Sequence, residues 1–390
     1  MRRKTLLTVA VILACLQAFA QSTIKITHGP YLQALHDTGV TIVWTTDAEA
    51  TGWVELAPDD STHFYLKERP RFFAGSHGFK NIGKLHKVTL KGLTPGTTYR
   101  YRIFSQEVLS HIGAKIQYGD VAATQVYRVE PLRFTTSRPD QKEVVFGVVN
   151  DIHGRNEVME KLLAQLDLKK TDLVFFNGDM ANDLRTEDQM FTDFMDTGTK
   201  IFAREIPMYY ARGNHETRGQ YASPFPEYFP SLTGNLYYMF RRGPICFVVL
   251  DCGEDKPDSD IEYSGIVNMD QYRSEQVEWL KEALKRPEYI NAPYKVVIAH
   301  IPPFGGWHGE EEIATKFVPL LNEAGAQVML SGHLHRHVKA PATAEGHKFP
   351  VLVNSNNAML RAKANDQKLL VEVVDQQGKV IDSLELRPQK

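Results

Sequence analysis

The sequence predicts an N-terminal all-β sandwich followed by an α/β domain, a mixed β sandwich flanked by helices. Up to about residue 138, hydrophobic and polar residues alternate, whereas beyond Glu143 apolar runs alternate with amphipathic stretches. The segment between these patterns, residues 135–141, contains serine and proline, as linkers do. A chain of 390 residues is long enough for two domains. We therefore place the two domains at residues 21–138 and 139–390.

The first twenty residues have the composition of a secretory signal peptide. Cations at positions 2–4 precede an apolar run at 6–16 and an A-x-A-like end at 18–20. The apolar run is shorter than the about 20 residues that span a membrane. We expect cleavage before Gln21 and an exported protein, periplasmic or secreted, without a transmembrane anchor. A lipoprotein acceptor at Cys15 and a twin-arginine signal are the alternatives.

Charge and cysteine content narrow the class of protein. A formal net charge of −2 gives no indication of a nucleic-acid or membrane partner. Outside the signal peptide, Cys246 and Cys252 flank one predicted strand. At about 3.3 Å per residue they lie too far apart to form a disulfide. The protein must therefore be stabilised by a hydrophobic core.

The N-terminal segment has the pattern of strands with one face in water. Residues 40–45 and 99–103 alternate hydrophobic and polar side chains, and Pro95-Gly96 marks a turn. No long helical pattern occurs in this segment. An antiparallel sandwich is therefore predicted.

Beyond Glu143 the pattern changes to strands that alternate with helices. Apolar runs rich in Val, Ile and aromatic residues predict buried strands at 144–149, 173–176, 206–210, 296–299 and 328–330. Leucine-rich amphipathic stretches predict helices at 158–166 and 277–284. Later runs predict closing strands at 351–353, 369–374 and 380–386. The acidic run 254–260 predicts a solvated loop, with a calcium site as the alternative.

A cluster of potential metal ligands follows each of the first five strands. The clusters are Asp151-Ile-His153, Gly178-Asp179, Gly213-Asn214-His215-Glu216, His300 and Gly332-His333-Leu334-His335. In α/β folds the ligand crevice lies at the carboxyl ends of the strands, so the clusters should converge on one edge. Carboxylate and imidazole suit Fe, Mn and Zn, and the absence of thiolates disfavours soft-metal sites. The arrangement predicts metal-assisted hydrolysis of a phosphate ester.

In this order, the five clusters resemble the signature of the calcineurin-like metallophosphoesterase superfamily. The sandwich in front of them resembles the layout of purple acid phosphatases. Within the sandwich, residues 92–99 are similar to fibronectin type III domains, in which a Leu and a Tyr bracket a turn. The resemblances cover nearly the whole mature chain.

The superfamily resemblance implies two divalent or mixed-valence metal ions, each Fe, Mn or Zn. The first would be held by Asp151, His153 and His335, the second by Asn214, His300 and His333, with Asp179 bridging both. Ions roughly 3.5 to 4 Å apart lower the pKa of a shared water and clamp the attacking and leaving oxygens. The implied nucleophile is a metal-bridging hydroxide.

The resemblance also implies roles beside the metals. His215 would point at the phosphate and stabilise the transition state or protonate the leaving group, although it could instead only orient Asn214. Asn214 would also contact the substrate. His308 is a candidate phosphate contact, with a plain loop histidine as the alternative. Arg155 is a further candidate, with an exposed arginine as the alternative.

One departure separates the chain from purple acid phosphatases. These enzymes place a metal-binding tyrosine three residues after the bridging aspartate, where this chain has Asn182. They also lack the histidine of Asp-x-His, which this chain has as His153. Without a tyrosinate ligand no purple charge-transfer band is expected, and an obligate ferric ion is put in doubt. Asn182 or Asp183 could orient His215.

The leading functional hypothesis is an exported enzyme that hydrolyses a small phosphorylated substrate, a phosphomonoester. A phosphodiesterase or pyrophosphohydrolase is the alternative, because the same metal pair serves all three reactions. A surface binding protein with a vestigial metal site is the alternative from another class. The complete ligand set disfavours it. Substrate recognition is expected in the loops at 218–234 and 254–268.

Overall fold

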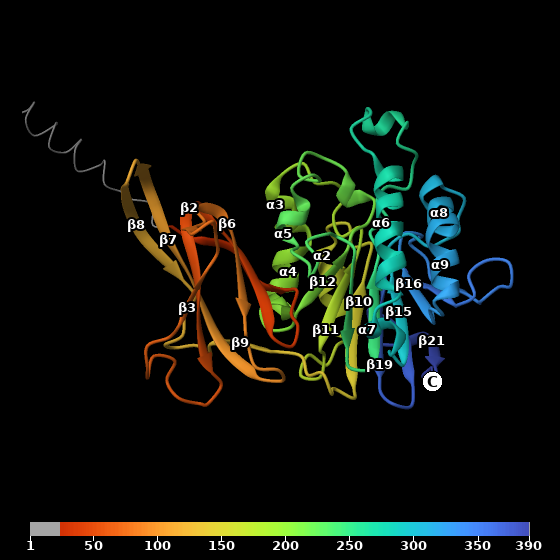
Figure 1. Cartoon of the computed structure of the whole chain (residues 1–390), viewed down its shortest axis with the longest axis horizontal. Helices are drawn as coiled ribbons and strands as arrows, with labels where there is room; N and C mark the ends of the chain where they lie inside the picture. The colour runs from red at the N-terminus through yellow and green to blue at the C-terminus, as the bar shows by residue number, and fades with distance from the viewer. Residues whose placement is uncertain (1–23, 390) are drawn as a thin grey trace, which may run out of the picture.

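The computed structural model describes residues 24–389 and shows a β domain beside a larger α/β domain (Figure 1). The predicted signal peptide, with Cys15, lies outside the described residues. Among residues 24–389, no helix is both long and apolar enough to cross a membrane. The predicted fold class, an antiparallel β domain followed by mixed α/β sheets, is confirmed.

The N-terminal domain is one antiparallel sheet folded around a core. Its strands are β1 (Ile26–Gln33), β2 (Gly39–Pro58), β3 (Arg71–Phe73), β6 (Gly83–Lys91), β7 (Thr98–Ile112), β8 (Lys115–Ala123) and β9 (Leu132–Thr135), beside the hairpin of β4 (Gly75–Ser76) and β5 (Phe79–Lys80). The first half of β2 pairs with β1 and β6, and its second half pairs with β3 and β7. Trp44 and Val54, one from each half, belong to the same buried cluster.

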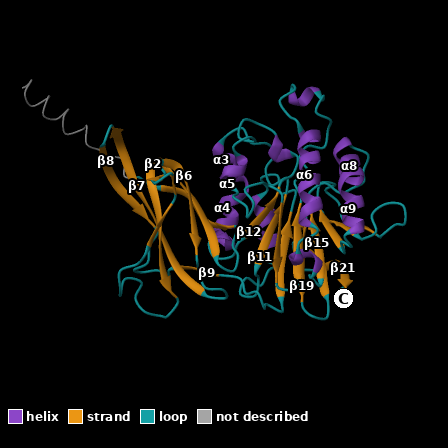
Figure 2. Cartoon of the chain, viewed as in Figure 1, coloured by secondary structure: helices purple, strands orange, loops and turns teal. Residues whose placement is uncertain are grey.

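The α/β domain contains two six-stranded sheets, drawn in orange in Figure 2. The first has the order β12 (Met208–Ala211), β11 (Leu173–Asn177), β10 (Val144–Val149), β19 (Ala358–Ala364), β20 (Leu369–Asp375), β21 (Val380–Leu386). The second has the order β13 (Tyr238–Arg242), β14 (Ile245–Val249), β15 (Tyr294–Ile298), β16 (Val328–Ser331), β18 (Val351–Val353), β17 (Val338–Ala340). One buried cluster, with Phe146 and Phe247, joins the two sheets. The strands that precede the five ligand clusters are parallel neighbours within their sheets.

Helices cover the outer face of each sheet and give a layered structure. On the first sheet lie α2 (Asn156–Leu163) and a continuous helical segment of α3 (Glu187–Met190), η1 (Phe191–Met195), α4 (Asp196–Gly198) and η2 (Thr199–Ala203). On the second sheet lie α6 (Met269–Ala283), α7 (Pro287–Ile290), α8 (His308–Glu312), η5 (Ile313–Phe317) and α9 (Val318–Glu323). The short helices η3 (His215–Thr217), α5 (Phe225–Tyr228) and η4 (Ile261–Tyr263) lie in loops.

Tyrosine hydroxyl groups join the two domains. Tyr209 on β12 donates to the Leu35 carbonyl at 2.6 Å, and Tyr101 on β7 donates to the Arg204 carbonyl at 2.6 Å. Tyr31 is fully buried in the same cluster as the helices on the first sheet. The N-terminal domain therefore packs against the β12 edge of the first sheet, and tyrosines from both domains donate hydrogen bonds to carbonyl oxygens at the junction.

A buried ion pair joins the carboxyl ends of strands from the two sheets. Arg212 follows β12 and Asp251 follows β14, and the guanidinium bonds the carboxylate at 3.1 and 2.9 Å. Tyr272 on α6 adds a hydroxyl donor at 2.8 Å. Because Asp251 is fully buried, its charge depends on these donors.

The substitution Asp251→Ala should lower the free energy of unfolding by about 3–5 kcal/mol, because it leaves the Arg212 charge buried without a partner. The double variant Arg212→Met/Asp251→Leu should lose less, since neither charge remains. Denaturant unfolding measures both variants. Glu278→Ala, which breaks an exposed pair on α6, is the control and should change stability by less than about 0.5 kcal/mol. Equal losses for the single and double variants would contradict the account.

Candidate metal centre

The five predicted clusters converge at one edge of the two sheets. Backbone hydrogen bonds hold their loops together: Asp151 N–H donates to the Gly178 carbonyl at 2.9 Å, and Gly332 N–H donates to the His300 carbonyl at 2.9 Å. Each loop begins where a parallel strand ends. Parallel topology therefore brings together side chains that lie far apart in the sequence.

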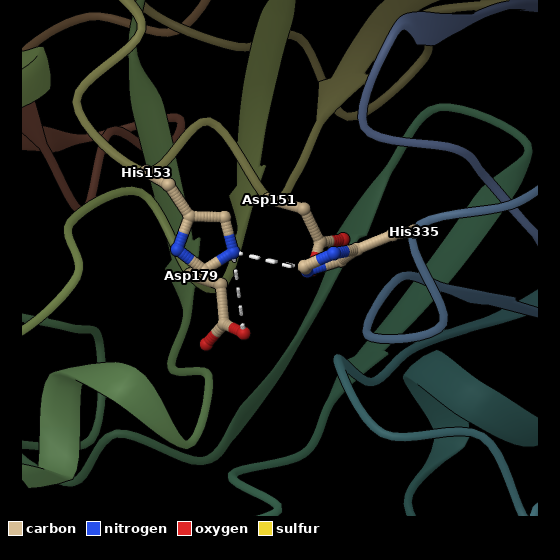
Figure 3. A group of neighbouring side chains, drawn as sticks. All are labelled: Asp151, His153, Asp179 and His335. Atoms are coloured by element: carbon tan, nitrogen blue, oxygen red, sulfur yellow. Dashed lines mark hydrogen bonds and ion pairs between the residues drawn. The ribbon is translucent and has the colours of Figure 1, made fainter.

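Four ligand candidates form a first group around His153 (Figure 3). The Nε2 atoms of His153 and His335 lie 3.1 Å apart. His335 Nε2 also lies 3.2 Å from Asp151 Oδ1, and His153 Nε2 lies 3.9 Å from Asp179 Oδ2. One donor atom from each of the four residues therefore faces a common point.

A second group shares Asp179 with the first and adds His300 and His333. His300 Nε2 lies 3.1 Å from Asp179 Oδ2. Asn214 Oδ1 lies 3.1 Å from His333 Nδ1, which places the amide beside this group. The structure thus brings all seven predicted ligands into two adjoining groups, with Asp179 common to both.

Buried donor atoms of these groups have the chemistry that a metal ion requires. Asp151 Oδ1 and His300 Nε2 are buried and form no hydrogen bond of good geometry, and their close polar neighbours, His335 and Asp179, are themselves candidate ligands. The other atoms of both residues are occupied: Asp151 Oδ2 accepts from Asn150 and from His333 N–H, and His300 Nδ1 donates to the Asn177 carbonyl at 2.7 Å. This bond leaves the His300 Nε2 lone pair for a cation. The carboxylates and imidazoles therefore fit two metal ions of the Fe, Mn or Zn type.

Five of the candidate ligands adopt left-handed backbone conformations. Asp151, His153, Asp179, His333 and His335 have φ values between 52° and 72°. Such conformations cost non-glycine residues on the order of 1–3 kcal/mol each and persist where the surrounding structure holds them. The backbone at the ends of β10, β11 and β16 is therefore shaped to present these side chains.

Charges within the site shift its pKa values in opposite directions. Burial opposes ionisation of Asp179, but His300 and the neighbouring histidines outweigh burial and hold the Asp179 pKa well below its usual range. Burial likewise opposes protonation of His300, but Asp179 and Asp151 overcome it and raise the His300 pKa to about 10. Burial lowers the His333 pKa to about 4. His300 must lose its proton to act as a metal ligand, whereas His333 is neutral at pH 7.

The carboxylate of Glu216 joins the loops that carry Asp179 and Asn214. It is fully buried and accepts hydrogen bonds from the backbone N–H groups of Asp179 at 2.9 Å, Met180 at 2.6 Å, Ala181 at 3.3 Å and Gly213 at 3.0 Å, and from the Tyr210 hydroxyl at 3.0 Å. Five donors on one carboxylate fix both loops. The sequence contained Glu216 within a cluster but did not reveal this role.

Close approach explains the glycines of two clusters. A Cβ atom on Gly213 would lie 2.2 Å from Asp179 Oδ1, and one on Gly178 would lie 2.4 Å from His300 Nδ1. Gly178 also has a φ of 80°. Side chains at either position would displace the candidate ligands.

Asn182 orients two histidines from the position where purple acid phosphatases carry a tyrosine. Its side-chain oxygen lies 3.1 Å from His153 Nδ1, and its backbone carbonyl lies 2.6 Å from His215 Nδ1. His215 Nε2 then remains free, 3.9 Å from Asp179 Oδ2. The predicted orientation of His215 by Asn182 is confirmed, and it uses the backbone.

The structure places the other two substrate-contact candidates in protein hydrogen bonds. His308 begins α8, and its Nε2 lies 2.8 Å from Asp270 Oδ1. The Arg155 guanidinium donates to the carbonyl groups of Ile152, Asp151 and Asn356 and to the Asn357 side chain. It is half-buried rather than exposed and ties the first ligand loop to the β18–β19 connection. Their roles as phosphate contacts stay predictions.

Glu310 is a further residue that sequence analysis missed. It is buried, and its Oε1 atom has no hydrogen-bond partner and lies 3.8 Å from His333 Nε2. Its Oε2 atom accepts from Trp307 N–H at 2.7 Å. A carboxylate behind a ligand histidine sets the orientation of the ring. The only indication in the sequence is that Glu310 is an acidic residue shortly after His300.

The two loops predicted to recognise the substrate are joined to each other. Arg218 forms a bidentate ion pair with Glu254 at 3.1 and 2.9 Å, and Thr217 donates to the same carboxylate at 2.9 Å. The prediction of a solvated acidic loop is wrong for Glu254 and Asp255, which are buried. Burial and the Glu254 carboxylate raise the Asp255 pKa to about 6.

The substitution Glu216→Gln should weaken metal binding about 10- to 100-fold, because an amide group would face backbone N–H donors with its own N–H. Metal content after dialysis against limiting metal and isothermal titration calorimetry measure the loss. Glu278→Gln on the exposed face of α6 is the matched control. Unchanged metal affinity in Glu216→Gln would contradict the role assigned to this carboxylate.

The substitution Asp255→Asn should stabilise the protein on the order of 1 kcal/mol at pH 7.5. The folded-state pKa of Asp255 lies above its unfolded value, so ionisation above pH 6 disfavours the folded state, and this cost disappears as the pH falls below about 4. The gain should therefore be smaller at pH 4.5. Denaturant unfolding at both pH values, with exposed Asp140→Asn as control, measures it. A gain that grows on acidification would refute the assignment.

Comparison with known proteins agrees with this geometry. Residues 144–337 match the calcineurin-like phosphoesterase family, and residues 29–122 match the purple acid phosphatase N-terminal domain. The first match contains all seven ligand candidates and His215.

Curated relatives are distant. Purple acid phosphatase 18 of Arabidopsis thaliana is 20% identical over 339 residues, which cover 80% of this chain and 66% of that protein. Purple acid phosphatase 22 of the same plant is 24% identical over 277 residues, covering 66% of this chain and 54% of that protein. The chain thus spans about half to two thirds of the length of these relatives.

The fold is shared with a solved plant enzyme. The structure of purple acid phosphatase PPD1 from yellow lupin (Lupinus luteus) seeds superposes with a TM-score of 0.65 at 16% identity, covering 92% of this chain and 74% of that one. The family matches, the shared fold and the two ligand groups joined by Asp179 lead to one conclusion. The chain belongs to the calcineurin-like phosphoesterase family and has an N-terminal domain of the purple acid phosphatase type.

Proposed function

We propose that the protein is an exported phosphatase that hydrolyses a small phosphomonoester with two metal ions. The observation that carries the proposal is the pair of ligand groups that share Asp179, with His215 Nε2 free beside them. The composition of residues 1–20 supports export. The phosphatase names of the relatives support a monoester.

The residues of the site have separate roles in holding the metal ions and in positioning the ligands. Bound metal ions supply Lewis acidity at the phosphate and lower the pKa of a water molecule. Asp151, His153 and His335 hold one side, Asn214, His300 and His333 hold the other, and Asp179 lies between. The left-handed ligand backbones and the Glu216 carboxylate keep these side chains in place before substrate binds.

His215 is the proposed proton donor. The Asn182 carbonyl accepts its Nδ1–H, which orients the ring and leaves Nε2 for the substrate. A protonated Nε2 can stabilise the phosphate charge and protonate a leaving alkoxide. The His215 ring stacks edge-on against ligand His153, with ring centroids 4.7 Å apart, so it adjoins the metal ligands.

The substitution His215→Asn should lower kcat for an alkyl phosphate about 10²- to 10⁴-fold, and less for an aryl phosphate whose leaving group needs no proton. Metal content should stay unchanged, because His215 is not a proposed ligand. Steady-state kinetics with both substrates and metal analysis measure these effects. Equal losses on the two substrates would remove the acid role and leave charge stabilisation.

Turnover of an aryl monophosphate and of the bis-aryl diester tests the substrate class. The monoester should be preferred by the metal-loaded protein, and chelation or Asp179→Asn should abolish its turnover. Preference for the diester would establish the phosphodiesterase alternative. A purified protein with less than one metal ion per chain and no turnover would support the vestigial binding protein instead.

A further inference from the structure

A cavity lies between the two domains, away from the metal centre. It has a volume of about 890 Å³ and is lined by β9 and the following connection from one domain. The other domain contributes η2, the loops before β11 and β12, and the last residue of β13, Arg242. Figure 1 shows β9 running toward the α/β domain. Asp172 precedes β11 and lines this cavity, whereas Asp179 follows β11. One strand of five residues, roughly 15–20 Å long, therefore separates the two sites.

Basic side chains outnumber acidic ones in the lining of the cavity. Its lining includes seven basic side chains: Arg133, Arg138, Lys169, Lys170, Lys200, Arg204 and Arg242. The acidic side chains in the lining are Asp172 and Glu205. Among the described residues, Arg138, Lys169 and Arg204 form no ion pair, whereas the other four do. Uncompensated charge in a concave site concentrates anions.

Two buried polar atoms in the lining, Arg242 Nε and Thr199 Oγ1, have no hydrogen-bond partner. Arg242 is 7% exposed, its Nε atom has no hydrogen-bond partner, and its contact with Asp172 is long at 3.4 Å. Thr199 is 4% exposed, and its Oγ1 atom is also unpartnered. A buried donor left unpaired costs about 1–3 kcal/mol, more when it is charged. A guanidinium N–H and a hydroxyl are both donors suited to an oxyanion.

We propose that this interdomain cavity binds a multivalent phosphate anion, separately from the metal centre. The excess of charge selects a multivalent anion, and guanidinium and ammonium groups bind phosphate oxygens. The lining also contains apolar side chains, among them Leu132, Phe134 and Phe202, which can contact an organic group attached to the phosphate. Because both domains line the cavity, the bound anion bridges them and stabilises their junction.

Titration calorimetry with inorganic pyrophosphate on the metal-loaded full chain tests the proposal. Wild type should bind at two classes of site, one of which survives in Asp179→Asn. The affinity of the surviving site for pyrophosphate should fall at least tenfold in Arg138→Gln/Arg204→Gln, which changes two exposed and unpaired cations. This affinity should also fall as the salt concentration rises. Turnover of an aryl phosphate should stay unchanged in that variant. A nucleoside diphosphate that binds more tightly than pyrophosphate would identify an organic phosphate as the occupant.

Two controls keep the outcome decisive. Arg128→Gln/Arg286→Gln removes two exposed arginines outside the cavity and should leave binding unchanged. Arg242→Gln tests the buried donor, and its folding is checked by its aryl phosphate turnover. Loss of all pyrophosphate binding in Asp179→Asn, or equal binding by the Arg138→Gln/Arg204→Gln variant and wild type, would overturn the proposal without affecting the proposed phosphatase activity.

Discussion

The site depends on the hydrogen bonds that the buried Glu216 carboxylate receives. Asp179 must hold a left-handed backbone conformation to reach both ligand groups, and this conformation is unfavourable for an aspartate. Three consecutive N–H groups, beginning at Asp179, converge on Glu216, and Gly213 N–H approaches it from the next loop. One carboxylate thus stabilises the strained turn after β11 and places it against the Asn214 loop. The parallel strands bring the ligand loops close together, and the hydrogen bonds to Glu216 fix the positions of these loops.

Much of this architecture could be predicted from local sequence. The apolar run at 144–149 coincides with β10, and each ligand cluster was expected where a strand ends. Glu216 and Glu310 could not be given roles, because their partners lie in other loops and only tertiary packing brings them together. The contact of Asn182 with His153 could not be predicted for the same reason. The helical segment from Glu187 to Ala203 was also missed. Its π turns at η1 and η2 disrupt the 3.6-residue periodicity on which helix prediction depends.

The N-terminal domain is not an independent module, because it forms part of the structure around the α/β domain. It covers the edge strand β12, and its Tyr31 hydroxyl donates to the Tyr228 carbonyl within one of the loops expected to recognise substrate. The same junction forms the basic cavity at the opposite end of β11 from the metal centre. The N-terminal domain therefore contacts a loop near the metal centre and also forms one wall of the basic cavity. An isolated α/β domain would lack this cavity.

Asn182 and His153 together set this centre apart from that of purple acid phosphatases, because Asn182 orients His153 where those enzymes are expected to use tyrosinate. Anomalous diffraction from crystals of the metal-loaded protein tests the central claim most directly. The account predicts two peaks, roughly 3.5 to 4 Å apart, with Asp179 between them and no tyrosine in contact. A single peak, or a pair that does not share Asp179, would contradict it.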